Sequence, residues 1–226
     1  MATSGTTDFN LNIDRVIERA YRRAGRSMRT GYDLDAARDN LNLLFSEWAN
    51  RGYQLWKVKN TTANLTANTS TYTAPSDADD ILEMVFRQTS GNTVTDTTMT
   101  KRSRSEYQNI PNKNSTGIPT QYYVRRNLAN VEINLYLTPL TTDTQINYWY
   151  VGRIEDVGAY TNTPDAPFRF LPCMVSGLAY YLSQEINPAL SAELERRYES
   201  ELARAITEDS QSTSVNIVPK NFYPGV

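Results

Sequence analysis

Four glutamates near the C-terminal end of the chain are close enough in sequence for their carboxylates to act together in catalysis: Glu193, Glu195, Glu199 and Glu201. Paired carboxylates can serve as the acid and the nucleophile of a glycosidase. A catalytic acid needs burial or a neighbouring charge that raises its pKa. Arg196 and Arg197 lie among these glutamates and would lower it instead. We therefore interpret the cluster as the solvated face of a helix.

Other familiar chemistry is excluded by composition. The chain has no histidine and one cysteine, Cys173, which removes Ser-His-Asp triads, Cys-His dyads and the common zinc and iron sites. It also has no phosphate-binding glycine motif of the GxxxxGK[ST] or GxGxxG type. We expect a protein that is not an enzyme, with no catalytic residues, no cofactor and no metal.

Arginines recur along the first predicted helix: Arg15, Arg19, Arg22, Arg26 and Arg29. Such a face could contact phosphates, because each cation near DNA releases counterions. It could equally be a solvated surface or one side of intersubunit ion pairs. The net charge of −2 over 226 residues argues against a chain that coats nucleic acid generally.

The last residues carry apolar side chains without any helical or strand period: Val215, Ile217, Val218, Phe222 and Tyr223. Pro219 and Pro224 punctuate them. A stiff segment of prolines and aromatics can dock in a groove at a reduced entropic cost. Packing on its own domain and binding a partner are both open for this tail.

Both ends of the chain predict helices. Apolar residues recur with a 3.6-residue period over 12–29 and 34–48. Gly25 and Gly52 are the predicted stops, and Asp33 is the predicted N-cap of the second helix. Two more helices are expected, one beginning between Pro167 and Pro172 and one from Pro188 to Glu208.

The middle of the chain predicts strands. The chain has 26 Thr and 20 Asn, and 32 of these residues lie between Lys59 and Asp165. Thr favours strands and Asn favours turns. Strict alternation marks a strand over 131–137, with 145–151 as its expected partner, and shorter strands are expected over 64–73, 81–88 and 92–100. The capping-box spacing of Ser103 and Glu106 predicts one short helix.

The element order predicts an α+β fold in which the N- and C-terminal helix pairs make a four-helix bundle. Residues 1–58 and 166–210 would form this bundle domain, 59–165 an inserted antiparallel β lobe, and 211–226 an extended C-terminal tail. No run approaches ~18 apolar residues, so no membrane span is expected. The first residues have neither a basic nor an apolar signal region, which predicts a chain that is not secreted.

Three stretches in order resemble the head-to-tail adaptor proteins (head completion or tail tubular proteins) of short-tailed, podovirus-type bacteriophages. The first is ERAYRRAG followed by LDAARDNLNLLFSEWANRGYQLWKV, the second runs from EYQNIPNKNSTGIPTQYYVRR into VEINLYLTPLTTDTQINYWYVGR, and the third is FRFLPCMVSGLAYYLSQE. Together they cover most of the chain.

The resemblance implies a structural virion protein at the head-tail junction, made in the host cytoplasm. Such proteins form a homo-oligomeric ring, usually of twelve copies, between the portal and the tail nozzle. The ring extends the channel through which double-stranded DNA passes without sequence-specific contact, and it sometimes carries fibres. In relatives the C-terminal extension reaches the portal, which makes the apolar tail residues above the expected portal contact. The Arg-rich first helix and the Glu-rich last helix are the expected intersubunit faces.

Two alternatives stay open. One is another phage tail or capsid protein whose β lobe binds a fibre or a saccharide. The other is a peptidoglycan-cleaving enzyme carried in the virion, against which the missing histidine and the exposed glutamates weigh.

Overall fold

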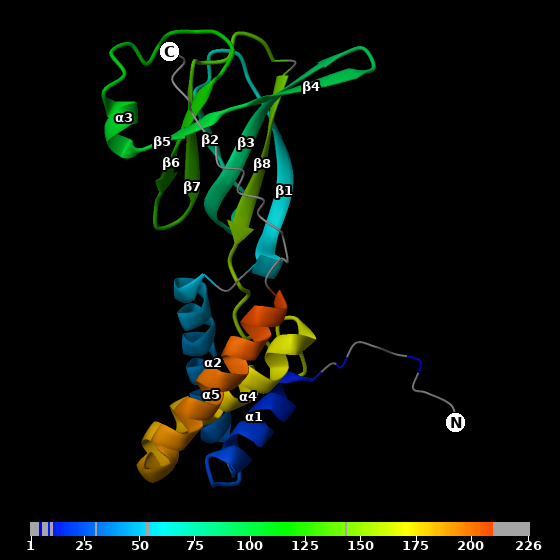
Figure 1. Ribbon diagram of the computed structural model, residues 1–226, viewed down its shortest axis with the longest axis vertical. Coiled ribbons are helices and arrows are strands. Elements are labelled where there is room, and N and C mark those ends of the chain that lie inside the picture. The colour runs from blue at the N-terminus through cyan, green and yellow to red at the C-terminus, as the bar shows by residue number, and fades with distance from the viewer. Residues whose placement is uncertain are drawn as a thin grey trace, which may run out of the picture.

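The computed structural model describes residues 5, 9, 11–29, 31–52, 55–142 and 144–209, and only the backbone of Leu55. The apolar tail residues Val215, Ile217, Val218, Phe222 and Tyr223 lie outside the described residues. The fold is mixed α+β, with a helical layer at one end of the molecule and two β-sheets at the other (Figure 1).

Four long helices make the helical layer: α1 (Ile13–Arg23), α2 (Gly31–Arg51), α4 (Leu171–Ile186) and α5 (Pro188–Asp209). They share one buried apolar cluster, which confirms the predicted periodicity. α4 packs against each of the other three helices, so it is buried on most sides. Even its small and polar residues Ser176, Gly177 and Ser183 are buried. The N- and C-terminal helix pairs therefore build a common core.

Glycines end the first two helices as predicted. Gly25 and Gly52 have φ of +85° and +74°, a conformation that a side chain disfavours. The predicted N-cap was wrong, because α2 already begins at Gly31. The Asp33 carboxylate instead accepts a hydrogen bond from the backbone N–H of Arg29 at 2.9 Å, so it ties the first turn of α2 to the preceding loop.

Prolines set the start of both C-terminal helices. A short 3-10 helix, η2 (Phe168–Phe170), leads into α4, whose first turn contains Pro172. Asn187 then leaves the helical region, with φ −149° and ψ 78°, as expected for a residue before proline. α5 begins at Pro188 and ends at Asp209.

The second part is a β lobe of two four-stranded sheets. One sheet has the order β1-β8-β3-β4 and the other β2-β7-β6-β5. Their bounds are β1 (Val58–Asn64), β2 (Thr71–Thr73), β3 (Ala78–Ser90), β4 (Thr93–Thr98), β5 (Thr100–Arg102), β6 (Gln121–Arg126), β7 (Val131–Tyr136) and β8 (Thr144–Gly152). The 3-10 helix η1 (Leu55–Lys57) leads into β1, and the short helix α3 (Arg104–Gln108) has the predicted capping box.

Strand pairing differs from the prediction. β8 does not pair with β7; it lies between β1 and β3, whereas β7 pairs with β2 and β6. The stretch 64–73 holds the end of β1, a turn and β2, and β6 had not been predicted as a strand of its own. The lobe is also not purely antiparallel, because β5 and β6 run parallel. Alternation fixes which face of a strand is buried but does not identify the strand beside it.

The two sheets enclose the second apolar cluster, to which Ile81, Tyr122, Ile133 and Tyr148 contribute fully buried side chains. The inner residues of β7 and β8 alternate with outer ones, as the sequence predicted. Among the helices that the structure describes, none is both long and apolar enough to cross a membrane.

Candidate functional site

The chain passes between the helical layer and the β lobe twice, and the described residues 55–58 of the first connection meet residues 152–168 of the second. Lys57, whose side chain is buried, forms an ion pair with Asp165. Asp165 also accepts a hydrogen bond from the backbone N–H of Glu155 at 2.9 Å, and its carbonyl accepts one from Trp56 Nε1 at 3.3 Å. This junction fixes the lobe to the helices.

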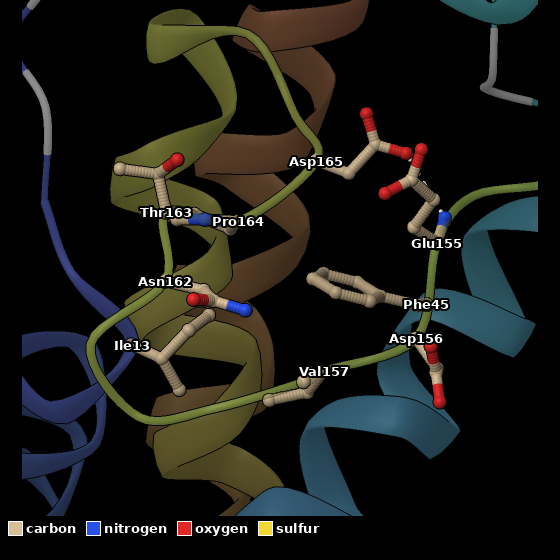
Figure 2. A pocket seen from close by; sticks show the side chains of 10 residues that line it. Ile13, Phe45, Glu155, Asp156, Val157, Asn162, Thr163, Pro164 and Asp165 are labelled. Carbon is tan, nitrogen blue, oxygen red and sulfur yellow. Dashed lines mark hydrogen bonds between the residues drawn. The ribbon is translucent and has the colours of Figure 1, made fainter.

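Beside the junction lies a pocket of about 220 Å³, enclosed by the loop 155–165 and the helical layer (Figure 2). Figure 2 shows Glu155 and Asp165 together at one end of the pocket, while Asp156 points away from them. The loop is held by α1, because the N–H groups of Ile13 and Asp14 donate to carbonyls of the loop, each at 3.0 Å. Within the described part of the chain, no group of three acidic, histidine or cysteine side chains could hold a metal ion. The geometry of the pocket fits a structural junction.

The five predicted arginines do not form one continuous face. Arg15, Arg19 and Arg22 lie on α1 and are exposed, whereas Arg26 and Arg29 lie in the loop that follows. Arg22 pairs with Glu18 at 2.6 Å. Arg26 pairs with Asp33 at 3.1 Å and is itself exposed.

Arg23 is a further arginine of α1, and its inward position had not been predicted. It points into the helical layer, where it contacts Ser176 and lies 3.6 Å from the Glu201 carboxylate. Ser176 donates a hydrogen bond to the same carboxylate at 2.5 Å, and Arg197 donates another at 3.0 Å. The signal was available: Arg23 follows Val16 and Ala20 at helical spacing, so it falls on the buried stripe.

Part of the predicted attraction between α1 and α5 is therefore intramolecular. Burial lowers the pKa of Arg23, and the neighbouring Glu201 opposes that shift. The ion pair joins α1 to α5 across α4, which places these two helices in a fixed relation within one subunit.

A second polar network joins α2 and α5. Arg51 donates two hydrogen bonds to Glu199, at 3.1 and 2.8 Å, and also pairs with Glu47. Its bond to Glu199 raises the pKa of Arg51 above its usual range. Trp48 Nε1 donates to the Tyr198 hydroxyl at 2.9 Å within the core. Glu199 and Glu201 thus serve as ion-pair partners of arginines within the fold.

In the β lobe, Asp80 of β3 bridges the two sheets. It pairs with Lys101 of β5 at 3.1 Å and with Arg126 of β6 at 2.6 Å. Burial would raise the pKa of Asp80, but the hydrogen bonds from Arg126 and Lys101 outweigh it and hold the pKa below the ordinary 3.8.

A carboxylate with a lowered pKa in the folded state contributes stability above its unfolded pKa and loses it as the pH falls through the folded value. We expect the free energy of unfolding to be higher for the native chain than for Asp80→Asn at pH 6, and the gap to shrink steadily below pH ~4. Chemical denaturation of both proteins, at pH 6 and below pH ~4, measures this difference in the free energy of unfolding. A gap independent of pH would contradict the role of Asp80.

The outer face of the sheet β1-β8-β3-β4 is polar around one exposed aromatic ring. Asn60 and Asn147 exchange hydrogen bonds between their side chains at 2.9 and 3.0 Å. Trp149, paired with Asn60 in the ladder, is 47% exposed beside them. The side-chain amides of Asn60 and Asn147 are therefore partnered with each other across the two strands.

Comparison with known proteins gives one family. The family model described as SU10 adaptor protein matches residues 11–219, which span the helical layer and the whole β lobe. The search of curated proteins finds no match to this chain.

Proposed function

Because the chain belongs to the SU10 adaptor protein family and is thus a structural protein of the phage virion at the head-tail junction, we propose that it forms a ring of twelve copies. The ring joins the portal to the tail nozzle and extends the channel for double-stranded DNA. Its role is structural, and it carries out no reaction.

The extent of the family match is the observation that carries this proposal. The match begins at residue 11, before α1, and ends at residue 219, beyond α5. It includes the two long helix pairs and the inserted lobe in one alignment, so the resemblance concerns the whole architecture. A match to the helices alone would be compatible with many unrelated helical proteins.

In the proposed ring, residues 1–58 and 166–210 form a four-helix bundle that builds the wall. The lobe 59–165 faces the tail nozzle or fibres. The tail 211–226 reaches the portal through its apolar residues, which are Val215, Ile217, Val218, Phe222 and Tyr223. The long axis of the molecule, with helices at one end and sheets at the other, supports this division (Figure 1).

The exposed arginines of α1 and of the loop after it are proposed to contact the neighbouring subunit or the DNA in the channel: Arg15, Arg19, Arg22, Arg26 and Arg29. Weak contact suits a channel, because tight phosphate binding would slow ejection. The double charge reversal Arg22→Glu with Arg26→Glu is expected to reduce ring formation severalfold, measured as the fraction of protein in rings by native mass spectrometry. A reversal also repels the present partners, Glu18 and Asp33, so the thermal melt of the variant must be recorded beside it.

Arg104→Glu supplies the matched control for this prediction. Arg104 is exposed on α3 of the β lobe, far along the chain from α1, and its reversal is expected to leave ring formation unchanged. Equal ring fractions for all three proteins would count against the α1 interface.

Electron microscopy of the chain mixed with the portal of the same phage tests the proposed function directly. A twelve-fold collar on one end of the portal is the expected result. The absence of any complex would refute the adaptor role, whereas a collar of another copy number would correct only the stoichiometry.

A further inference from the structure

The hairpin of β3 and β4 extends beyond its own sheet. β8 pairs with β3 only as far as Gln88, whereas β4 continues along β3 to Ser90. Gly91, with φ +58°, begins the two-residue turn at the tip, as a tight hairpin requires. Figure 1 shows this ribbon projecting away from the two sheets.

Nothing in the described chain covers β4. All six of its residues are exposed, on both faces of the strand, and it pairs with β3 alone. A two-stranded ribbon without a packed face is marginally stable by itself. Its Thr-rich sequence favours strand, and it lacks the proline or lysine that commonly blocks an exposed edge.

The same sheet has a second open edge. Among the residues that the structure describes, β1 pairs with β8 alone, and the sheet order β1-β8-β3-β4 leaves β1 and β4 at opposite sides. β1 has seven residues and β4 has six, so the two edges match in length. The charges near both edges are compensated within the chain: Lys59 pairs with Asp77 and Arg87 pairs with Asp96, each at 2.7 Å.

We propose that β4 of one copy adds to the β1 edge of the next copy, so that the sheet continues from subunit to subunit. The contact joins two different surfaces of one molecule, which is the kind of contact that repeats around a ring. Backbone hydrogen bonds supply the affinity, as in other strand additions. This inference rests on the proposed ring and identifies the surface that closes it.

The hairpin turn tells which backbone groups of β4 are available. The pair that flanks a two-residue turn, Ser90 and Thr93, is hydrogen-bonded, and such pairs alternate along an antiparallel ladder. The N–H groups of Val94 and Asp96 therefore face away from β3. Proline at position 94 removes one outward donor and leaves the pairing with β3 intact.

Val94→Pro is accordingly the test variant, and Val94→Thr is its control, since threonine keeps the N–H. Ring formation with the portal is measured by electron microscopy, and folding by thermal melting. We expect Val94→Pro to melt at the same temperature as the native chain. We expect it to form fewer rings than the native chain, by a factor of roughly ten or more. We expect Val94→Thr to form rings normally.

A crosslinking experiment identifies which molecule lies at the β4 edge. It also tests the proposal if Val94→Pro melts at a lower temperature than the native chain. A chain carrying Thr95→Cys in β4 and Thr61→Cys in β1 is treated with a short bis-maleimide during assembly. Cys173 does not compete, because it is fully buried and burial raises the pKa of its thiol to about 12. A ladder of covalent multimers is expected.

The outcomes separate the two proposals. Rings that form without a crosslink ladder, or rings of Val94→Pro as abundant as those of the native chain, would overturn the edge contact and leave the adaptor role in place. A crosslink from β4 to the portal or the nozzle would overturn the choice of a second copy as its partner. A native chain that makes no collar overturns the proposed function and this inference with it.

Discussion

Replacing Trp48 by alanine is expected to lower the free energy of unfolding by about 3–5 kcal/mol. Trp48 is fully buried, its ring centroid lies 5.7 Å from that of Phe45 and 5.6 Å from that of Phe170, and its N–H donates to Tyr198. The change leaves a cavity and removes the donor to a buried hydroxyl, so two costs combine. Urea denaturation monitored by circular dichroism measures the loss.

Trp149→Ala is the matched control, because it removes the same side chain from the half-exposed outer face of the β lobe. Its effect on stability is expected to stay within about 1 kcal/mol. Similar losses for the two variants would contradict the central position of Trp48 in the helical core.

Gly177→Val is expected to destabilise the chain toward the upper end of the ~1–3 kcal/mol typical of overpacking. A Cβ at this position of α4 would lie 2.9 Å from Leu44 Cδ1 of α2 and 2.9 Å from Tyr198 Cε2 of α5. Both neighbours are themselves buried and cannot withdraw without opening the core. The better helix propensity of a residue with a side chain offsets only part of this, about 0.5 kcal/mol.

Gly31→Val provides the comparison for Gly177→Val. Gly31 begins α2, and a Cβ there would meet no atom within 4 Å. Its effect is expected to be about 0.5 kcal/mol or less. Thermal melts of both variants measure the difference, and a Gly177→Val chain that melts with the native one would show that α4 does not pack as closely as described.

Much of the helical layer could be predicted from the sequence, because burial there follows one strong period. Leu41, Leu44 and Trp48 fall on one stripe and are all buried, and Gly25 and Gly52 end their helices. The capping box at Ser103 is local chemistry and was likewise predictable. These features depend on residues that lie within a few positions of one another.

What the sequence could not predict depends on contacts between distant residues. The alternation of β8 identifies its buried face, but the choice of β1 and β3 over β7 depends on how the two sheets enclose Ile146 and Tyr148. The spacing of Arg23 from Val16 and Ala20 places it on the buried stripe of α1, but its ion-pair partner, Glu201 of α5, could not be predicted from the sequence. The portal contact of the apolar tail stays a prediction.

The helical core joins residues that are far apart in the order of synthesis. The bond between Trp48 and Tyr198 closes a span of 150 positions, and contacts of such separation form slowly. A growing chain therefore exposes the apolar stripes of α1 and α2 until α4 and α5 have been made, whereas the β lobe is complete earlier because its strands follow one another. Synthesis of α5 completes this core, so a chain truncated before α5 would have no finished helical surface to offer a neighbour.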